Sequence, residues 1–131
     1  MIFAKEMLAT QKNLEQLGHQ ALIPIDTHDC LEKPELQDDL VWAINQKVDK
    51  DHFNKVADSD AVLILNYPKN NIQGYIGGST LMELAIARHF NKKIFILHEL
   101  PSENEIRYIL EIKVMQPIIL KGDLTKINDY I

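Results

Sequence analysis

Apolar and polar positions along the chain follow two different periods, and the changes of period divide the chain into short strands and longer helices. The first apolar positions recur at helical spacing: Phe3, Met7, Leu14 and Leu17. The pattern stops at Gly18, a residue type that commonly ends helices because it adopts positive φ at little cost. The chain is therefore predicted to begin with an amphipathic helix.

Ala21–Ile25 predicts a short buried strand, and the polar residues 26–30 predict a loop of the kind that carries function. From Pro34 to about Asp58 the apolar period is helical, which indicates one or two helices that cover a sheet. Ala61–Leu65 is an uninterrupted apolar run, typical of a parallel strand buried on both faces. Five later elements are expected in this order: a helix ending near Phe90, a strand at 94–97, a helix at 103–113, a strand at 117–120 and a helix at 123–130.

Strands that alternate with helices of this length indicate repeated right-handed crossover units. The predicted fold class is α/β: a three-layer, flavodoxin- or Rossmann-like sandwich with helices on both faces of a mostly parallel sheet of four to five strands. The length of 131 residues suits a single domain that covers residues 1–131. In such sheets ligands bind outside the carboxyl ends of the strands, where Asp26, Asn66 and His98 are expected.

Charge and cysteine content argue against several classes of partner and site. A net charge of −5 at pH 7 disfavours a nucleic acid polymer, because Lys and Arg supply most of that affinity. Cys30 is the only cysteine, so neither an internal disulfide nor a thiolate zinc site is expected. The longest apolar run is too short to span a bilayer, and no export signal is evident. We expect a cytoplasmic protein with no membrane partner, no metal and no cofactor.

The stretch Gly74–Glu83 (GYIGGSTLME) concentrates candidate chemistry, because it holds three of the five glycines and ends on a carboxylate. Glycines let the backbone turn sharply and approach a ligand closely. Ser79 and Thr80 follow where a helix is expected to begin, and its first N–H groups suit a phosphate, a carboxylate or a sugar hydroxyl. An ionised Glu83 at that place would suit nucleophilic attack on the anomeric carbon of a sugar.

A structural interpretation of Glu83 competes with the catalytic one. Thr80-Leu-Met-Glu83 matches the capping box S/T-x-x-E, in which the glutamate reaches back to the N–H of the capping threonine. Such boxes are common, whereas catalytic carboxylates are few. The spacing of these residues leaves both interpretations open.

Four segments carry a family resemblance: Phe3–Pro24, Ala57–Asn66, Gly74–Ala87 and Lys92–Leu97. Together they resemble the nucleoside 2-deoxyribosyltransferase superfamily, which also includes 2′-deoxynucleoside 5′-phosphate N-hydrolases. In that superfamily the glutamate after the glycine-rich turn forms a glycosyl-enzyme intermediate, and Glu83 is the matching position. The resemblance implies cleavage or transfer of the N-glycosidic bond of a (deoxy)nucleoside or its 5′-monophosphate by a homo-oligomer.

Six further residues are expected to bind this small-molecule substrate: Asp26, Asn66, Tyr75, Gly77, Gly78 and Ser79. The backbone N–H groups of the turn would hold sugar hydroxyls or a phosphate. Asn66 would line the floor of the site, and the base would be recognised by Asp26, Asp29 or Asn66. Tyr75 either stacks on the base or packs over the sheet edge.

Two departures from the family's pattern bear on the function. The turn carries no acid, whereas transferases commonly have an aspartate there that helps to bind the base. The chain also begins at its first helix, where family members have a strand and a loop that forms a wall of the pocket. The absent first strand favours a non-catalytic nucleotide-binding or sensing module of the same fold. A further alternative is a cytokinin-type phosphoribohydrolase, because Gly77–Glu83 is similar to the Pro-Gly-Gly-x-Gly-Thr-x-x-Glu turn of those lysine-decarboxylase-like enzymes.

Overall fold

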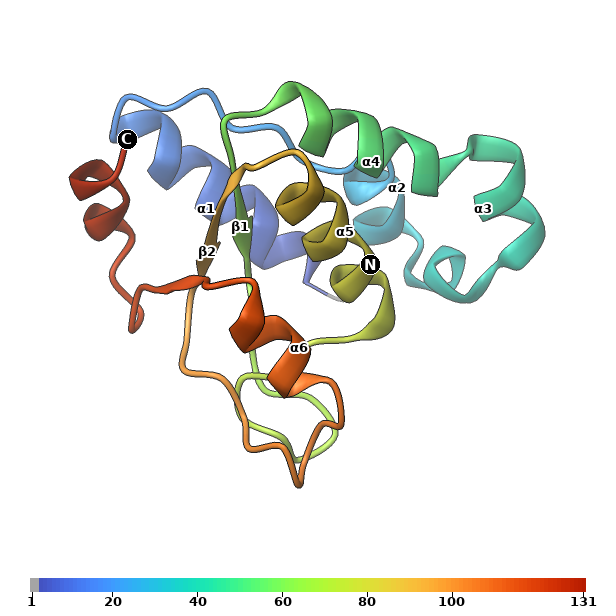
Figure 1. The fold of residues 1–131 in the computed structure, drawn as a ribbon. Coiled ribbons are helices and arrows are strands. Elements are labelled where there is room, and N and C mark those ends of the chain that lie inside the picture. Colours follow the sequence, from blue (N-terminus) through green and yellow to red (C-terminus); the bar gives the residue numbers. More distant parts are fainter. Residues whose placement is uncertain (1–2) are drawn as a thin grey trace. The chain divides into compact units, whose positions relative to one another are not determined.

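The computed structural model describes residues 3–131 and contains two compact units, one ending at Lys55 and one beginning at Val56 (Figure 1). The first unit contains α1 (Ala4–Gln16), α2 (Thr27–Glu32), the 3-10 helix η1 (Pro34–Asp38), α3 (Leu40–Gln46) and most of α4 (Val48–Asp58). The second contains β1 (Ala61–Ile64), α5 (Gly78–His89), β2 (Lys93–Ile96), α6 (Ile109–Val114), β3 (Ile118–Ile119) and the 3-10 helix η2 (Leu124–Asp129). The prediction of a single domain over residues 1–131 stays a prediction.

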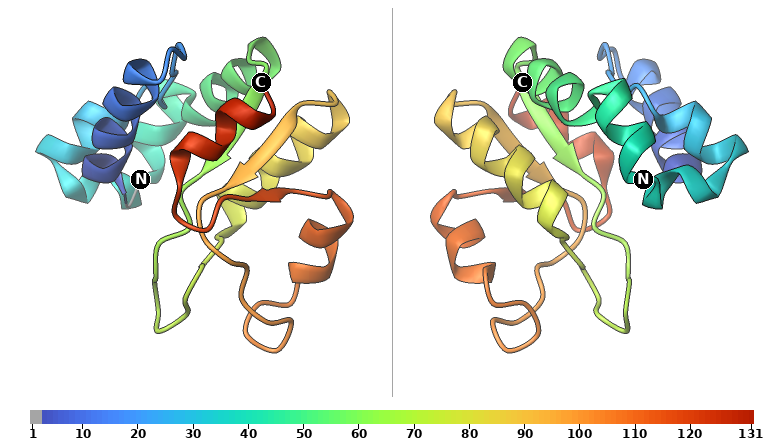
Figure 2. Two further views of the ribbon diagram at one scale, coloured as in Figure 1. Left: turned by 90° about the vertical axis from the view of Figure 1, so that its left-hand side faces the viewer. Right: turned by 90° about the vertical axis from the view of Figure 1, so that its right-hand side faces the viewer.

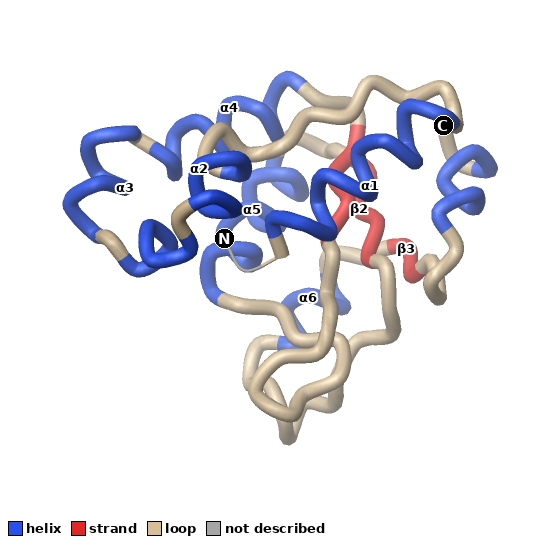
Figure 3. The backbone as a smooth tube through the Cα atoms, turned by 180° about the vertical axis from the view of Figure 1, so that it is seen from behind, coloured by secondary structure: helices blue, strands red, loops and turns tan. Residues whose placement is uncertain are grey.

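Helices make up most of the regular structure, as the blue segments of Figure 3 show. Within residues 3–131, no helix combines the length and the apolar character that crossing a membrane requires.

The predicted first helix is confirmed, and Gly18 ends it as expected. Gly18 has a positive φ of 94°, which lets the chain turn out of the helix. The N–H of Gly18 donates to the Glu15 carbonyl oxygen (3.1 Å), and the N–H of His19 donates to that of Leu14 (3.0 Å). This pair of bonds is a Schellman motif, which satisfies two carbonyl groups at the end of α1.

The strand predicted at Ala21–Ile25 is wrong, because side chains rather than a neighbouring strand bond its backbone. The Gln11 side chain donates to the Ala21 carbonyl oxygen (2.9 Å), and Lys55 Nζ donates to that of Ile23 (2.7 Å). The N–H of Ile25 donates to an Asp51 carboxylate oxygen (3.0 Å). Pro24 has no N–H to give to a ladder, and Ile25 is 54% exposed, so the segment lacks the burial that the apolar run suggested.

The polar loop predicted at residues 26–30 is also wrong, because Thr27–Glu32 forms the short helix α2. Thr27 and Cys30 are buried and lie three residues apart, so they share one face of the helix. Both the N–H and the hydroxyl of Thr27 bond to the Pro24 carbonyl oxygen (3.1 and 2.7 Å), which fixes the turn into α2. A helix buried through Thr and Cys lacks the large apolar residues on which a periodicity argument depends.

The helical region predicted from Pro34 to about Asp58 contains η1, α3 and α4. The Asp39 carboxylate caps α3 by accepting the N–H of Trp42 (3.0 Å). Lys47 then adopts left-handed backbone (φ 51°, ψ 45°), which separates α3 from α4.

The sheet of the second unit has three strands in the order β1-β2-β3, all parallel, rather than the four to five strands that the sequence predicted. Val62 pairs with Ile94 and Ile64 with Ile96 between β1 and β2. Ile96 pairs in turn with Ile119 of β3. The α/β class and the parallel arrangement are confirmed. The predicted three-layer sandwich with four to five strands is not observed within residues 3–131, because the sheet has only three strands and Ala21–Ile25 does not join it.

One face of this sheet packs against α5 and α6. The core cluster on this face contains Ile64, Ile94 and Ile96 from the strands, Leu84 and Ala87 from α5, and Ile109 and Ile112 from α6. Alternate residues of a strand point to opposite faces, so Ile94 and Ile96 of β2 share this face. Right-handed crossovers between strands in sequential order place both connecting helices on the same side, as observed.

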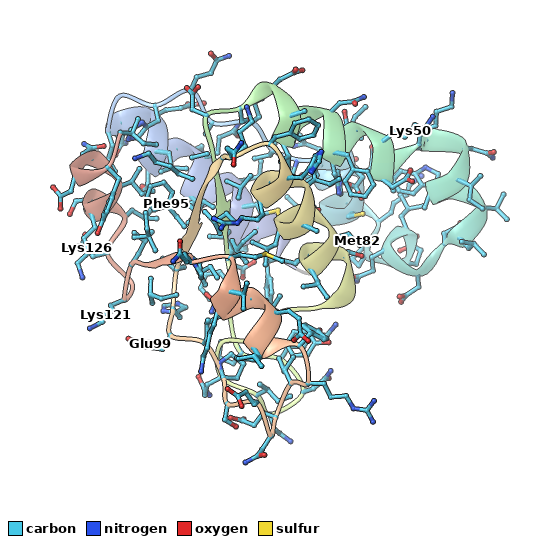
Figure 4. The ribbon with its side chains drawn as sticks, in the orientation of Figure 1. Lys50, Met82, Phe95, Glu99, Lys121 and Lys126 are labelled. Carbon is cyan, nitrogen blue, oxygen red and sulfur yellow. The ribbon has the colours of Figure 1, made fainter. Side chains whose placement is uncertain are left out.

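The opposite face of β2 meets the C-terminal segment. Phe95 is buried, and its ring contacts that of Tyr130 edge to face (centroids 5.9 Å apart). Figure 2 shows η2 (red) and α5 (yellow) on opposite sides of the β1 and β2 ribbons, and Figure 4 labels Phe95 between them. Within the second unit the sheet therefore has helical segments on both faces.

The helices expected at residues 103–113 and 123–130 are shorter or tighter than predicted. Regular α-helix in the former region begins only at Ile109, after two separate turns. In the first turn the Ser102 N–H donates to a Glu105 carboxylate oxygen (3.3 Å). Ile106 is buried in the core, and the Tyr108 hydroxyl bonds to the Ile76 carbonyl in the glycine-rich turn. These tertiary contacts interrupt the helix. The C-terminal segment is the 3-10 helix η2, which Asp123 caps through the Thr125 N–H (3.0 Å).

The packing of α5 predicts different effects for two apolar truncations on the same helix. Leu84 is fully buried in the core, so Leu84→Ala should lower the free energy of unfolding by about 2–5 kcal/mol, through lost burial and a residual cavity. Met82 is 52% exposed, and Met82→Ala should change it by less than about 1 kcal/mol. Urea unfolding followed by circular dichroism measures both changes. Equal losses for the two variants would contradict the assigned face of α5.

Candidate functional site

The candidate site lies where β1 and β2 end, and a buried amide organises it. Asn66 is 0% exposed. Its Nδ2 donates to the His98 carbonyl oxygen (2.9 Å), and its Oδ1 accepts the N–H of His98 (2.8 Å). Nδ2 is also 3.4 Å from the carbonyl oxygens of Gly74 and Glu99. The Asn66 side chain, predicted to line the floor of the site, is therefore engaged with the backbone of both loops that follow the strands.

Gly74 allows these two loops to approach each other. Its φ of +74° lies in the left-handed region that glycine adopts readily. A Cβ atom at this position would lie 2.2 Å from the Glu99 carbonyl oxygen, which is far inside van der Waals contact. The beginning of the glycine-rich stretch thus serves loop packing and not direct contact with a ligand.

The rest of the turn is supported by aromatic residues. The Tyr108 hydroxyl donates to the Ile76 carbonyl oxygen (2.5 Å). Burial, and then the proximity of Tyr75, raise the pKa of Tyr108, so the hydroxyl keeps its proton and remains a donor. Tyr75 packs partly against the core, and Lys69 Nζ lies over its ring (5.3 Å from the centroid). Tyr108 was not among the predicted site residues, because the sequence placed it inside a continuous helix.

The start of α5 presents backbone donors. Gly77 is the N-cap in extended conformation (φ −87°, ψ 175°), and its carbonyl oxygen accepts the N–H of Leu81 (3.0 Å). The N–H groups of Gly78, Ser79 and Thr80 consequently have no partner within the helix. Gly78 and Ser79 are exposed, so this helix start can bind an anion or a hydroxyl group from solution.

The register of α5 decides against the capping box. Because Gly77 is the N-cap, Thr80 is the third residue of the helix and Glu83 is the sixth. A capping box needs the threonine at the N-cap and the glutamate at the third helical position. The interpretation of Glu83 as the box partner of Thr80 is therefore wrong.

Glu83 is half-buried and lies beside the buried stripe of α5 that Leu84 and Ala87 form. On the other side of this stripe, Arg88 Nη1 donates to the Met115 carbonyl oxygen just after α6 (3.4 Å). Successive helical residues are 100° apart, so Glu83 and Arg88 flank the stripe and Glu83 faces away from α6. It is on the β1 side of the helix, one turn in from the donors of Gly78 and Ser79.

Neighbouring loops add four side chains to this end of the sheet. The rings of Tyr67 and His98 meet edge to face (centroids 5.6 Å apart), directly after β1 and β2. Glu99 and Lys121 form an exposed ion pair (3.9 Å), and Figure 4 shows both labels at the same edge of the second unit. His98 was predicted at this strand end, and the structure places it there.

Asp26 belongs to the first unit, where it forms a buried pair with His52. Asp26 Oδ1 is 3.3 Å from His52 Nε2, and the Cys30 thiol donates to Oδ2 (3.9 Å). Burial alone would raise the pKa of Asp26, but the hydrogen bond and charge of His52 outweigh burial, and the pKa lies below its usual value. Burial, followed by the charge of Asp26, raises the pKa of the Cys30 thiol, which disfavours the reactive thiolate.

Among residues 3–131, no group of three or more His, Cys, Asp or Glu side chains is arranged to hold a metal ion. Comparisons of the chain with protein-family models, with curated proteins and with solved structures found no match. The site residues and the family expected from the sequence therefore stay predictions, which the geometry above refines.

Two glycine substitutions test the loop packing at Gly74. Gly74→Ala should lower the free energy of unfolding by about 2–3 kcal/mol, because Ala disfavours positive φ and its Cβ would overlap the Glu99 carbonyl. Gly78→Ala is the matched control, since a Cβ there meets no atom within 4 Å and alanine favours the helix. It should be neutral or stabilising by up to about 1 kcal/mol. Thermal or urea unfolding reports both, and a neutral Gly74→Ala would refute the close approach.

The Asp26–His52 pair predicts a pH-dependent stability. Since folding lowers the Asp26 pKa below 3.8, its contribution is present above about pH 4 and is lost as pH falls through the lower folded value. Asp26→Asn should reduce the free energy of unfolding by about 1–3 kcal/mol at pH 7, and by much less at pH 2–3. Urea unfolding at several pH values measures this. Asp38→Asn, at an exposed carboxylate, should change stability at pH 7 by less than about 0.5 kcal/mol.

Proposed function

We propose that the protein cleaves or transfers the N-glycosidic bond of a (deoxy)nucleoside or its 5′-monophosphate, with Glu83 as nucleophile, as a member of the nucleoside 2-deoxyribosyltransferase superfamily. One observation carries this proposal. Glu83 is one helical turn from the exposed N–H groups of Gly78 and Ser79, at the carboxyl end of the sheet, and the register of α5 removes its role as a capping-box partner. The sequence resemblance supplies the reaction class.

The reaction proceeds in two displacements at the anomeric carbon. A Glu83 carboxylate oxygen forms a bond to C1′ while the C1′–N bond breaks, and the bonding electrons leave with the base, which takes up a proton from solvent. The sugar is then held as an ester of Glu83. Water or a second base attacks C1′, frees the carboxylate and loses a proton to solvent. Water gives hydrolysis, and a second base gives transfer.

The helix start holds the sugar end of the substrate. The N–H groups of Gly78 and Ser79 bind a 5′-phosphate or a sugar hydroxyl, and a Cβ added at Gly78 would meet no atom within 4 Å. Tyr75 and Tyr67 flank the turn in sequence and offer rings on which a base stacks. Asn66 contributes by holding the two loops in place. The protein acts in the cytoplasm, without a cofactor, as a homo-oligomer.

A non-catalytic nucleotide-binding or sensing module is the second candidate. The engagement of Asn66 favours it, because the buried amide already bonds to backbone atoms and the turn itself offers a ligand mainly N–H groups. Such a turn binds a phosphate without using Glu83. The two candidates therefore predict opposite consequences for the loss of the Glu83 carboxylate.

Base release separates the two candidates. Incubation with a panel of deoxynucleosides, nucleosides and their 5′-monophosphates, followed by chromatography, should detect free base with the parent protein. Glu83→Gln should reduce the rate of base release at least about a thousandfold. The glutamine amide is a poor nucleophile, and nucleophilic attack on C1′ accounts for at least this much of the rate enhancement. Glu111→Gln, at an exposed carboxylate of α6, should retain the parent rate.

The outcome that contradicts catalysis is equally definite. If no compound of the panel yields base, and a 5′-monophosphate raises the melting temperature of the parent and of Glu83→Gln equally, the protein is a binding module. If Glu83→Gln releases base at the parent rate, Glu83 is not the nucleophile.

A further inference from the structure

The first unit contains a hollow of about 410 Å³ that the proposed reaction does not use. Three short elements surround it: Asp29 and Glu32 come from α2, Leu36 from η1, and Trp42 and Gln46 from α3, with Lys33 after α2. Asp29 and Glu32 are three residues apart, and Trp42 and Gln46 are four apart, so each helix presents one face to the hollow. The volume is within the range that small ligands occupy in proteins.

The charge around this hollow favours a cation. Residues 26–51 contain eight acidic and three basic side chains, a net charge of −5, which equals the net charge of the whole chain. Asp29 and Glu32 are exposed, and neither forms an ion pair with the described residues. Two carboxylates on one helical face, in the most acidic region of the chain, create a negative potential that attracts cations.

The walls of the hollow favour a cation with an apolar body. Trp42 is half-buried, and its backbone position is fixed by the bond of its N–H to the Asp39 carboxylate at the start of α3. Indole has the most favourable ring for a cation–π contact, and Leu36 adds an apolar wall. A bare metal ion would not use the indole or the leucine, whereas an alkylammonium group uses both and also the carboxylates.

We propose that this hollow binds a small organic cation of the alkylammonium class, with its charged group between the carboxylates of Asp29 and Glu32 and its methyl or methylene groups against Trp42. Lys33 lies in the same lining and competes with the ligand for these carboxylates. The ammonium of Lys33 thus weakens the site, and its removal strengthens it. This site is independent of Glu83 and of the proposed reaction.

The single tryptophan provides a direct readout. Trp42 is the only tryptophan of the chain, so selectively excited tryptophan fluorescence reports on the surroundings of this hollow. Titration with choline at constant ionic strength should give a saturable fluorescence change, with half-saturation of about 1 mM or below, the weak end of specific binding. The neutral isostere 3,3-dimethylbutan-1-ol should give no saturable change, because it lacks the charge that the carboxylates recognise.

Matched variants separate local recognition from the overall charge. Asp29→Asn and Glu32→Gln should each weaken choline binding by about two- to fivefold, as expected for exposed charge contacts. Lys33→Gln should tighten it to a similar extent. Lys47→Gln removes the same charge outside the lining and should change the affinity less than Lys33→Gln. Circular dichroism confirms that each variant is folded.

Three results would overturn the proposal: no saturable signal with choline in the folded parent protein, equal binding of the neutral isostere, or equal effects of Lys33→Gln and Lys47→Gln. The first would show that the hollow takes no alkylammonium ligand of this size. The second would show a purely apolar contact, and the third would show attraction by net charge alone.

Discussion

The hydrogen bonds of the buried Asn66 amide are the constraint on which the candidate site depends. Parallel strands end together at one edge of a sheet, but the loops that follow them need separate interactions to keep a fixed geometry. Asn66 supplies these by bonding to the N–H and carbonyl of His98 and by reaching the carbonyls of Gly74 and Glu99. Leaving the buried Asn66 amide without a partner would cost about 1–3 kcal/mol of stability. The amide therefore joins the two loops into one structure at the end of β1 and β2.

The position of the start of α5 depends on the two loops that Asn66 joins. Gly74 permits the close contact with Glu99, and Tyr108 holds the Ile76 carbonyl from the α6 side. The chain then enters α5 at Gly77 with three backbone N–H groups available and Glu83 one turn further on. The glycine-rich stretch thus has two parts: Gly74 serves packing, while the exposed Gly78 leaves the helix start accessible. The proposed chemistry needs both parts, because a nucleophile acts only on a substrate held at a fixed distance.

The sequence predicted those elements whose burial rests on large apolar residues. Ala61–Leu65 and Ile94–Leu97 became adjacent parallel strands, and the helix after the glycine turn packs through Leu84 and Ala87 as its spacing indicated. The sequence-based prediction failed where hydrogen bonds or small buried residues, and not large apolar side chains, hold a segment in place. Ala21–Ile25 is held by side chains of α1 and α4, and α2 is buried through Thr27 and Cys30. The capping box was wrong because φ and ψ at Gly77, which spacing does not reveal, set the helix start three residues before Thr80. Tyr108 was missed because only the tertiary fold brings it to the turn.

If Glu83 carries the sugar during the reaction, the mass of the protein during turnover reveals it most directly. A reaction with a cleavable nucleoside or nucleotide is stopped with acid, and the intact protein and its proteolytic peptides are weighed by mass spectrometry. We expect an added mass equal to the substrate minus its base, confined to the peptide that contains Glu83. Release of base without any adduct, or an adduct that maps to another residue, would contradict this role of Glu83.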